Sequence, residues 1–245
     1  MIDFFGDFVR ENRERLFLNG FVKIDKEKLF DINNYLNSVK RLDENIDNFE
    51  NQTKQKGTFT LKQKLQEVNK ELFLDNLFNS NLYNICCNVT GQKLYLTNFK
   101  HYLTKGITPE LGWHRDTYYR NEKYHGLIPT GYKLAIYVSD VQEDDGCTAF
   151  VKGSHRIDFN NRYFDFFLTH FSNKIHKVKL KKGDAVLFNV NLIHNRLKAK
   201  QNNSTRSVTI FAFGLSKFYQ KKYFTSYNQP IIDYFNKELN KEDTW

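Results

Sequence analysis

The residues in this sequence best suited to metal binding are His114 and Asp116, an imidazole and a carboxylate two positions apart. Side chains alternate across a β-strand, so both groups point to one face if this segment is extended. A third ligand must come from elsewhere, and His194 is the fitting candidate. Two imidazoles and one carboxylate, with coordination positions left open, are typical of non-haem Fe(II) oxygenases rather than of closed zinc sites. The pattern predicts an iron site whose ligands are also the catalytic residues.

The context of this pair matters, because a lone His-x-Asp pair is common in proteins that bind no metal. Trp113 would place a large apolar ring beside a dry site, where we expect it to border the substrate. Arg206 opens an apolar strand predicted over 207–213. An unpaired buried charge is costly, so Arg206 needs an anionic partner.

A small dicarboxylate would supply that partner. If Arg206 points inward, Val208, Ile210 and Ala212 share its face. One carboxylate would accept the two-pronged contact of the guanidinium, while a keto-acid end chelates the iron. This is the arrangement that a 2-oxoglutarate-dependent oxygenase requires, and it leaves a coordination position for dioxygen.

Three further residues are candidates for contacts with the cosubstrate. Lys100 and Tyr102 share one face of a strand predicted over 94–102, and His101 lies on the other face. If the first face lines the interior, Lys100 or Tyr102 would touch cosubstrate or substrate; packing in the core or at the rim is the alternative interpretation. Arg196, close to His194, is a candidate for a second anion contact.

Hydrophobic periodicity predicts helices in the first part of the chain and strands in the second. The turn Asn19-Gly20 ends the first helix, and Asp25 is a candidate cap for the second. Residues 43–60 are polar and are expected to form a loop, and the aromatic insertion 156–176 is expected to shape a site. The helices are expected over 3–18, from 25 through 39, over 61–79 and over 82–89; the strands are expected over 21–24, 94–102, 133–138, 148–151, 177–180, 185–189 and 207–213.

This order predicts an α+β fold, mainly β, in which a helical layer supports one antiparallel β unit. We expect a single domain over 1–245. Within it, 1–90 would be mainly helical support, 91–215 the β core and 216–245 a C-terminal tail.

Composition limits the class of protein and its partners. Hydrophobic residues make up 40% and aromatic residues 16%, which is ample for a core. The net charge of +9 favours anionic partners, although a solvated surface is the alternative reading of these bases. The bases are dispersed along the chain, which does not favour nucleic acid as a target. The cysteines Cys86, Cys87 and Cys147 form no CxxC pair, and no apolar run is long enough for a secretory signal or a membrane span, so we expect a cytoplasmic protein.

Several motifs, in this order and spacing, together resemble the phytanoyl-CoA dioxygenase-like branch of the Fe(II)/2-oxoglutarate oxygenases. The resemblance covers about residues 15–215, and one departure is Lys152, where the family turn before His155 usually has proline. His155 is therefore expected to be structural. The motifs are Asn19-Gly20-Phe21-Val22-Lys23-Ile24, Trp113-His114-Arg115-Asp116, Tyr132-Lys133-Leu134-Ala135-Ile136-Tyr137-Val138 with Asp140, Asp145-Gly146-Cys147-Thr148-Ala149-Phe150, Gly153-Ser154-His155, Gly183-Asp184-Ala185-Val186-Leu187-Phe188, His194 and Arg206.

The resemblance implies a double-stranded β-helix, or jelly roll, that binds Fe(II) through the predicted ligands and 2-oxoglutarate through Arg206. It also places substrate contacts at Tyr118 and His125, for which an exposed loop is an equally good interpretation. Halogenating relatives replace the carboxylate at the position of Asp116 with a small residue, so its presence here implies a hydroxylase or desaturase.

The function expected from these observations is hydroxylation of an unactivated C–H bond, with release of succinate and CO2. The substrate would be a small, anionic metabolite, such as a carbohydrate, lipid or secondary-metabolite intermediate. Two alternatives stay open: a hydroxylase of protein or nucleic acid, and a jelly-roll binding protein without turnover.

Overall fold

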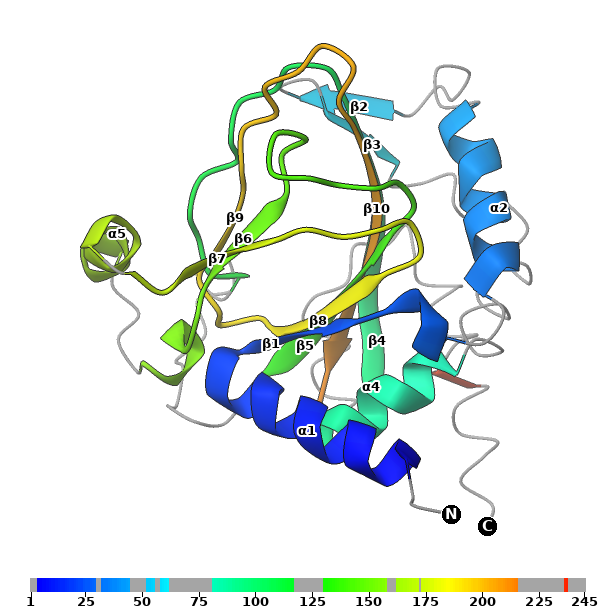
Figure 1. Ribbon diagram of the computed structural model, residues 1–245, viewed down its shortest axis with the longest axis vertical. Helices are drawn as coiled ribbons and strands as arrows, with labels where there is room; N and C mark the ends of the chain where they lie inside the picture. The colour runs from blue at the N-terminus through cyan, green and yellow to red at the C-terminus, as the bar shows by residue number, and fades with distance from the viewer. Residues whose placement is uncertain are drawn as a thin grey trace.

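A seven-stranded antiparallel sheet and a smaller three-stranded antiparallel sheet form the centre of the molecule (Figure 1). The computed structural model describes residues 4–29, 32–44, 52–55, 58–61, 81–116, 130–157, 162–171, 173–215 and 236–237. The larger sheet has the order β1 (Phe21–Ile24), β8 (Ala185–Asn189), β5 (Gly131–Tyr137), β10 (Thr205–Gly214), β4 (Tyr95–Lys105), β3 (Thr58–Leu61) and β2 (Gln52–Gln55). The smaller sheet has the order β7 (Ile175–Val178), β6 (Thr148–Val151) and β9 (His194–Arg196).

The two faces of the larger sheet have different neighbours, because alternate residues of each strand point to opposite sides. On β5, Leu134 and Ile136 belong to an outer core that includes residues of the helices. Ala135 and Tyr137 belong instead to an inner core with residues of the smaller sheet, such as Phe150. The fold is thus a jelly roll with a helical layer on one side, as the sequence predicts.

Helices cover the outer face of the larger sheet. They are α1 (Phe4–Asn19), α2 (Ile32–Glu44) and α4 (Leu82–Thr90), with a 3-10 turn η1 at Lys26–Lys28. Figure 1 shows α1 and α4 beside each other below the sheet and α2 at its side. No helix among the described residues is long and apolar enough to cross a membrane.

The end of α1 confirms the predicted stop at Asn19-Gly20. Gly20 has a φ of 85°, a left-handed conformation that favours glycine. A Cβ on Gly20 would lie 2.5 Å from Nδ1 of His155, so the position has no room for a side chain. His155 belongs to the 3-10 turn η5 (Ser154–Arg156), and its Nε2 donates a hydrogen bond of 3.0 Å to the carbonyl of Phe17. This bond ties η5 to α1, as expected for a structural histidine.

Two local predictions were wrong. The polar stretch 43–60 is not one loop, because residues 52–55 and 58–61 form β2 and β3 at the edge of the larger sheet. Polar residues are common on such an edge strand, where neither packing nor a hydrophobic period identifies the strand from sequence. The second helix does not start after Asp25; a 3-10 turn follows there and α2 begins at Ile32. The helix predicted over 61–79 lies outside the described residues, apart from Leu61 in β3.

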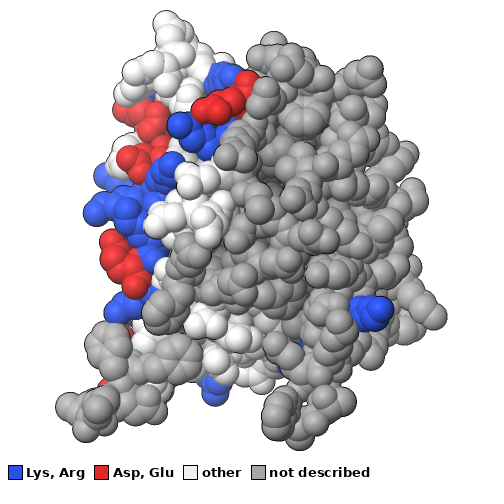
Figure 2. Space-filling model, turned by 90° about the vertical axis from the view of Figure 1, so that its right-hand side faces the viewer, with Lys and Arg blue, Asp and Glu red and all other residues white. Residues whose placement is uncertain are grey.

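The aromatic insertion contains a helix, α5 (Arg162–Phe171), which lies beside the smaller sheet and away from the other helices (Figure 1). Several of its large side chains are exposed, including Tyr163 and Phe171. Asp165, by contrast, is buried. Elsewhere, on the face shown in Figure 2, the described Lys and Arg side chains lie among Asp and Glu side chains rather than in a patch of one sign.

Candidate metal and cosubstrate site

The fold brings His114, Asp116 and His194 together although almost eighty residues separate the pair from the third member. One ligand atom from each of the three residues lies within 4.8 Å of the others. The rings of His114 and His194 have centroids 4.3 Å apart, and Nε2 of His194 lies 3.7 Å from Oδ2 of Asp116. These separations match three donors facing one common position, so the group is a candidate metal centre.

Backbone pairing sets this geometry. The segment around His114 runs antiparallel to the segment around His194, and these two residues exchange N–H···O hydrogen bonds of 3.0 Å in both directions. The amide of Asp116 donates to the carbonyl of Val190 at 3.1 Å. Asn195, which is fully buried, accepts the N–H of Gly112 on its side-chain oxygen at 2.9 Å. The two ligand-bearing segments therefore form one rigid unit.

Both histidines present Nε2 to the common position. Nδ1 of His114 donates to the carbonyl of Gly112 at 2.9 Å, and Nδ1 of His194 donates to the carbonyl of Leu192 at 2.8 Å. Because each Nδ1 donates its proton to a carbonyl, Nε2 is the ring nitrogen that is left to bind a metal. Burial lowers the pKa of His194 to about 4, so this ring is neutral at pH 7.

The two carboxylate oxygens of Asp116 differ in their hydrogen bonding to the described residues. Its Oδ1 accepts a hydrogen bond of 2.6 Å from Nζ of Lys133, whereas its buried Oδ2 has no hydrogen-bond partner among the described residues. Burial alone would raise the pKa of Asp116, but the charge of Lys133 and the adjacent imidazoles outweigh it and hold the pKa well below its usual range. An ionised, unpartnered oxygen facing two Nε2 atoms fits a divalent cation.

Sequence reasoning missed Lys133. It lies on β5 on the same side as Ala135 and Tyr137, opposite Ala212 of β10 and Phe188 of β8. The signal was present, because Lys133 is a cation in an otherwise apolar strand, the same feature that singled out Arg206.

Arg206 lies on the inner face with its guanidinium incompletely bonded. It is 5% exposed, and its Nη2 donates only long hydrogen bonds, of 3.4 Å to Tyr137 Oη and 3.3 Å to Thr148 Oγ1. Its Nε is buried and has no partner in the described part of the chain. A buried guanidinium with an unused donor fits a carboxylate ligand. Val208 shares its face in the inner core and Ile210 packs against that core, as predicted.

The two candidates on β4 also lie on the inner face. Tyr102 is opposite Val208 and Lys100 is opposite Ile210 on β10. Burial raises the pKa of Tyr102 to about 12, with a further contribution from the charge of Asp116 that Arg206 opposes, so Tyr102 lies near both. His101 points the other way, where Nε2 bonds Asp43 of α2 at 2.7 Å. Contact of Lys100 or Tyr102 with cosubstrate stays a prediction.

The remaining predicted residues are placed as follows. Arg196 donates to Thr108 Oγ1 at 2.8 Å and to the carbonyl of Pro109 at 2.9 Å, contacts that use its guanidinium within the protein and do not favour the anion contact predicted for it. Trp113 is half-buried beside the ligand pair. Tyr118 and His125 lie outside the described residues.

Comparison with known proteins identifies the family. The family model described as phytanoyl-CoA dioxygenase (PhyH) matches residues 19–208. No curated protein matches the sequence.

Solved structures with the same fold have low sequence identity to this chain. The non-haem, alpha-ketoglutarate-dependent carbocyclase SnoK from nogalamycin biosynthesis is 15% identical with a TM-score of 0.66, covering 84% of this chain and 83% of that one. EctD from S. alaskensis, solved with 2-oxoglutarate and 5-hydroxyectoine, is 13% identical with a TM-score of 0.65, covering 83% and 75%. HygX from Streptomyces hygroscopicus, solved with nickel and 2-oxoglutarate, is 17% identical with a TM-score of 0.63, covering 85% and 87%.

These likenesses establish a shared fold, and the family match spans most of the chain. The chain belongs to the phytanoyl-CoA dioxygenase family, and it is a dioxygenase-type enzyme.

Proposed function

We propose that this enzyme hydroxylates an unactivated C–H bond of a small anionic metabolite and releases succinate and CO2. His114, Asp116 and His194 would hold Fe(II), and Arg206 would bind the distal carboxylate of 2-oxoglutarate. The observation that carries the proposal is a pair of polar groups on one inner surface that have no hydrogen-bond partner among the described residues: Oδ2 of Asp116, beside the two histidine ligands, and Nε of Arg206. When bound, the iron supplies the oxidising chemistry, and the protein supplies position and protection from water.

The residues around the cosubstrate position are suited to binding rather than to proton transfer. The guanidinium of Arg206 can offer two parallel N–H donors to a carboxylate. Tyr137 and Thr148, which bond each other through their hydroxyl groups at 2.7 Å, hold that guanidinium from one side. The apolar neighbours Phe150 and Phe188 keep water away from His194, with ring centroids 6.3 and 5.2 Å from its ring.

The charges on the inner face support an anionic substrate. Among the described residues, Lys133 bonds Asp116, and Arg206 is a second cation on the same inner face. Fe(II) and the dianion of 2-oxoglutarate offset each other in formal charge, so the loaded site keeps an excess of positive charge. A carboxylate or phosphate on the substrate would offset it and would be attracted into the site.

The presence of Asp116 supports oxygen insertion over halogenation, because the carboxylate occupies the position that a halide would need. The hydroxylated compound found with EctD, 5-hydroxyectoine, is consistent with that outcome. SnoK and SnoN, named a carbocyclase and an epimerase, mark the competing outcomes on this fold.

The test begins with anaerobic addition of Fe(II) and 2-oxoglutarate to the full chain. We expect the weak visible charge-transfer band of a chelated ferrous site, and its absence from folded, iron-loaded protein would contradict the cosubstrate assignment. Pools of carboxylated and phosphorylated metabolites would then be screened for substrate-dependent succinate release and a product heavier by one oxygen atom. Succinate release without an added oxygen, such as a product lighter by two hydrogens, would contradict hydroxylation.

A further inference from the structure

The residue between the two adjacent metal ligands, Arg115, has its side chain on the side opposite theirs and is almost completely buried. It is 2% exposed and is the largest fully buried side chain of the described chain. Strand alternation explains the placement, because His114 and Asp116 point to one face and Arg115 must point to the other. A buried arginine at this position requires partners that satisfy five N–H donors.

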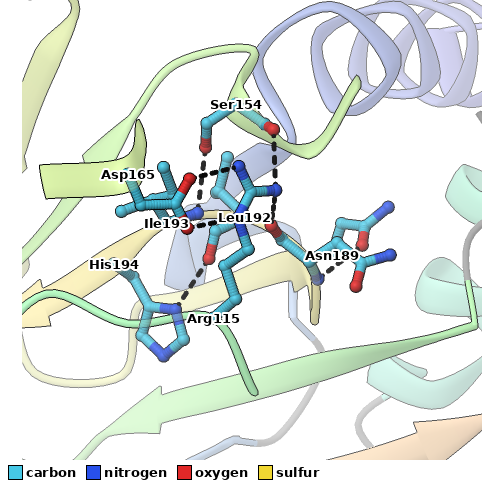
Figure 3. A network of polar contacts seen from close by, with 8 residues as sticks. Arg115, Ser154, Asp165, Asn189, Leu192, Ile193 and His194 are labelled. Atoms are coloured by element: carbon cyan, nitrogen blue, oxygen red, sulfur yellow. Dashed lines mark hydrogen bonds and ion pairs between the residues drawn. The ribbon is translucent and has the colours of Figure 1, made fainter. Parts of the chain in front are cut away.

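The partners of four of these donors come from three separate segments. Nε and Nη2 of Arg115 donate to the two carboxylate oxygens of Asp165 on α5, at 2.7 and 2.9 Å. Nη1 donates to the carbonyl of Ser154 at 2.9 Å and to the carbonyl of Asn191 at 2.8 Å. Figure 3 shows the guanidinium lying between Asp165 and Ser154.

The same network reaches the third metal ligand. Ser154 Oγ accepts the amide N–H of Ile193, directly before His194, at 2.9 Å, and Nδ1 of His194 donates to Leu192 (Figure 3). The Asn191 carbonyl held by Arg115 lies three residues before His194. The segment that carries His194 is therefore attached to Arg115 at its start and to Ser154 at its end.

We propose that Arg115 is a positioning residue for the metal centre, and that Asp165 of the aromatic insertion holds the guanidinium of Arg115 in place. The inference rests on the proposed function, because it assigns the network to the orientation of the metal ligands. Asp165 neutralises a guanidinium that would otherwise be an unpaired buried charge, and the two-pronged contact fixes its plane. With that plane fixed, Nη1 adds a side-chain contact between the His114–Asp116 segment and the start of the His194 segment, which the backbone hydrogen bonds join at the ligands themselves.

The competing explanation is that the Arg115–Asp165 ion pair only stabilises the fold. A double substitution distinguishes this explanation from a positioning role. Replacement of a buried ion pair by apolar residues is often neutral for stability, whereas removal of one partner is not. R115M/D165L should therefore retain the stability of the natural protein while losing the contacts to Ser154 and Asn191. We expect its Kd for Co(II) to rise about 10- to 100-fold, as for other groups that orient metal ligands.

A matched control is H101L/D43L, which replaces the His101–Asp43 pair on the helix-covered face and away from the ligands. It should leave the Kd and the visible spectrum of bound Co(II) unchanged. If R115M/D165L binds Co(II) with the affinity and spectrum of the natural protein, the inference is wrong. If the natural protein itself binds neither Co(II) nor 2-oxoglutarate, the proposed function has failed instead.

Two measurements cover the case in which the double variant does not fold or no metal binds. Arg115→Lys keeps the charge but not the planar fork, so it cannot reach Asp165 and both carbonyls together; we expect weaker Co(II) binding, and unchanged binding would overturn the inference. In metal-free protein, amide exchange at Ile193 should accelerate in R115K relative to the Lys23→Met variant. Lys23 forms ion pairs with Asp25 and with the buried Asp184, and neither residue is a predicted ligand. Equal exchange in both would contradict positioning by Arg115.

Discussion

Substitution of Arg206 by methionine should abolish most 2-oxoglutarate binding without destabilising the free protein. The guanidinium has only two long hydrogen bonds, of 3.3 and 3.4 Å, and an unpartnered Nε among the described residues. Loss of a poorly bonded buried charge costs little, so the melting temperature of the free protein should stay the same or rise.

In the presence of 2-oxoglutarate, by contrast, the variant should melt at a lower temperature than the natural protein. A ligand present at a hundred times its Kd stabilises a protein by about 2.7 kcal/mol, which for a chain of this length raises the melting temperature by about 5–11 °C. Truncation of one partner of a buried, hydrogen-bonded charge pair costs about 2–5 kcal/mol. At the same ligand concentration, R206M should therefore gain only about 1 kcal/mol or less.

The assay is thermal denaturation with Ni(II) and 2-oxoglutarate, which avoids oxidation, and Arg196→Met is the matched control. Arg196 is also a buried arginine, but its bonds of 2.8 and 2.9 Å are made within the protein. R196M should lower the melting temperature of the free protein and keep the 2-oxoglutarate shift. If R206M keeps the full shift, or R196M loses it, the assignment of the cosubstrate carboxylate to Arg206 is refuted.

Three further predictions concern the metal ligands and the turn that supports them. Lys133→Met should destabilise the metal-free protein, because it leaves the carboxylate of Asp116 buried without its ammonium partner. Co(II) should then raise the melting temperature of the variant more than that of the natural protein. An equal rise in both proteins would contradict this prediction. Asp116→Ala should abolish 2-oxoglutarate-dependent succinate formation while far-UV circular dichroism stays unchanged, and retained turnover would exclude Asp116 as a ligand. Burial lowers the pKa of His155 to about 4 in the folded protein. As pH falls below about 6.5, the unfolded chain takes up a proton at this histidine before the folded chain does. The free energy of unfolding should therefore decrease by up to about 3 kcal/mol between about pH 6.5 and pH 4. In urea unfolding, His155→Gln should remove that part of the pH dependence, whereas substitution of the exposed His170 by Gln should leave it in place. Equal pH profiles for the two variants would contradict the assignment of this pH dependence to His155.

Most strands of the fold are predictable from the sequence, but their pairing is not. Alternation and turn residues located β1, β6 and β8 to the residue and located the other predicted strands to within a few positions, because apolar residues mark buried strands. The edge strand β2, its neighbour β3 and the short strand β9 were missed, because their sequences carry no such mark. The partners of β8, which are β1 and β5, come from distant parts of the chain, and no local pattern specifies that pairing.

For the site, residue types and spacing were enough to select His114, Asp116, His194 and Arg206. Those choices depend on chemistry, because few side chains can bind a divalent cation or satisfy a buried guanidinium, and such residues are rare in apolar strands.

The partners of those residues were decided only by tertiary structure. Lys133 bonds Asp116 because β5 passes the ligand segment at that height, and Arg115 finds Asp165 because an insertion fifty residues later folds back as α5. Arg196 illustrates the converse, since its nearness to His194 in sequence suggested an anion contact, while the fold gives its guanidinium to Thr108 and Pro109. The sequence by itself determined which groups can do the chemistry. The three-dimensional packing decided which of them meet, because hydrogen bonds and ion pairs between distant segments depend on distances that the order of residues does not contain.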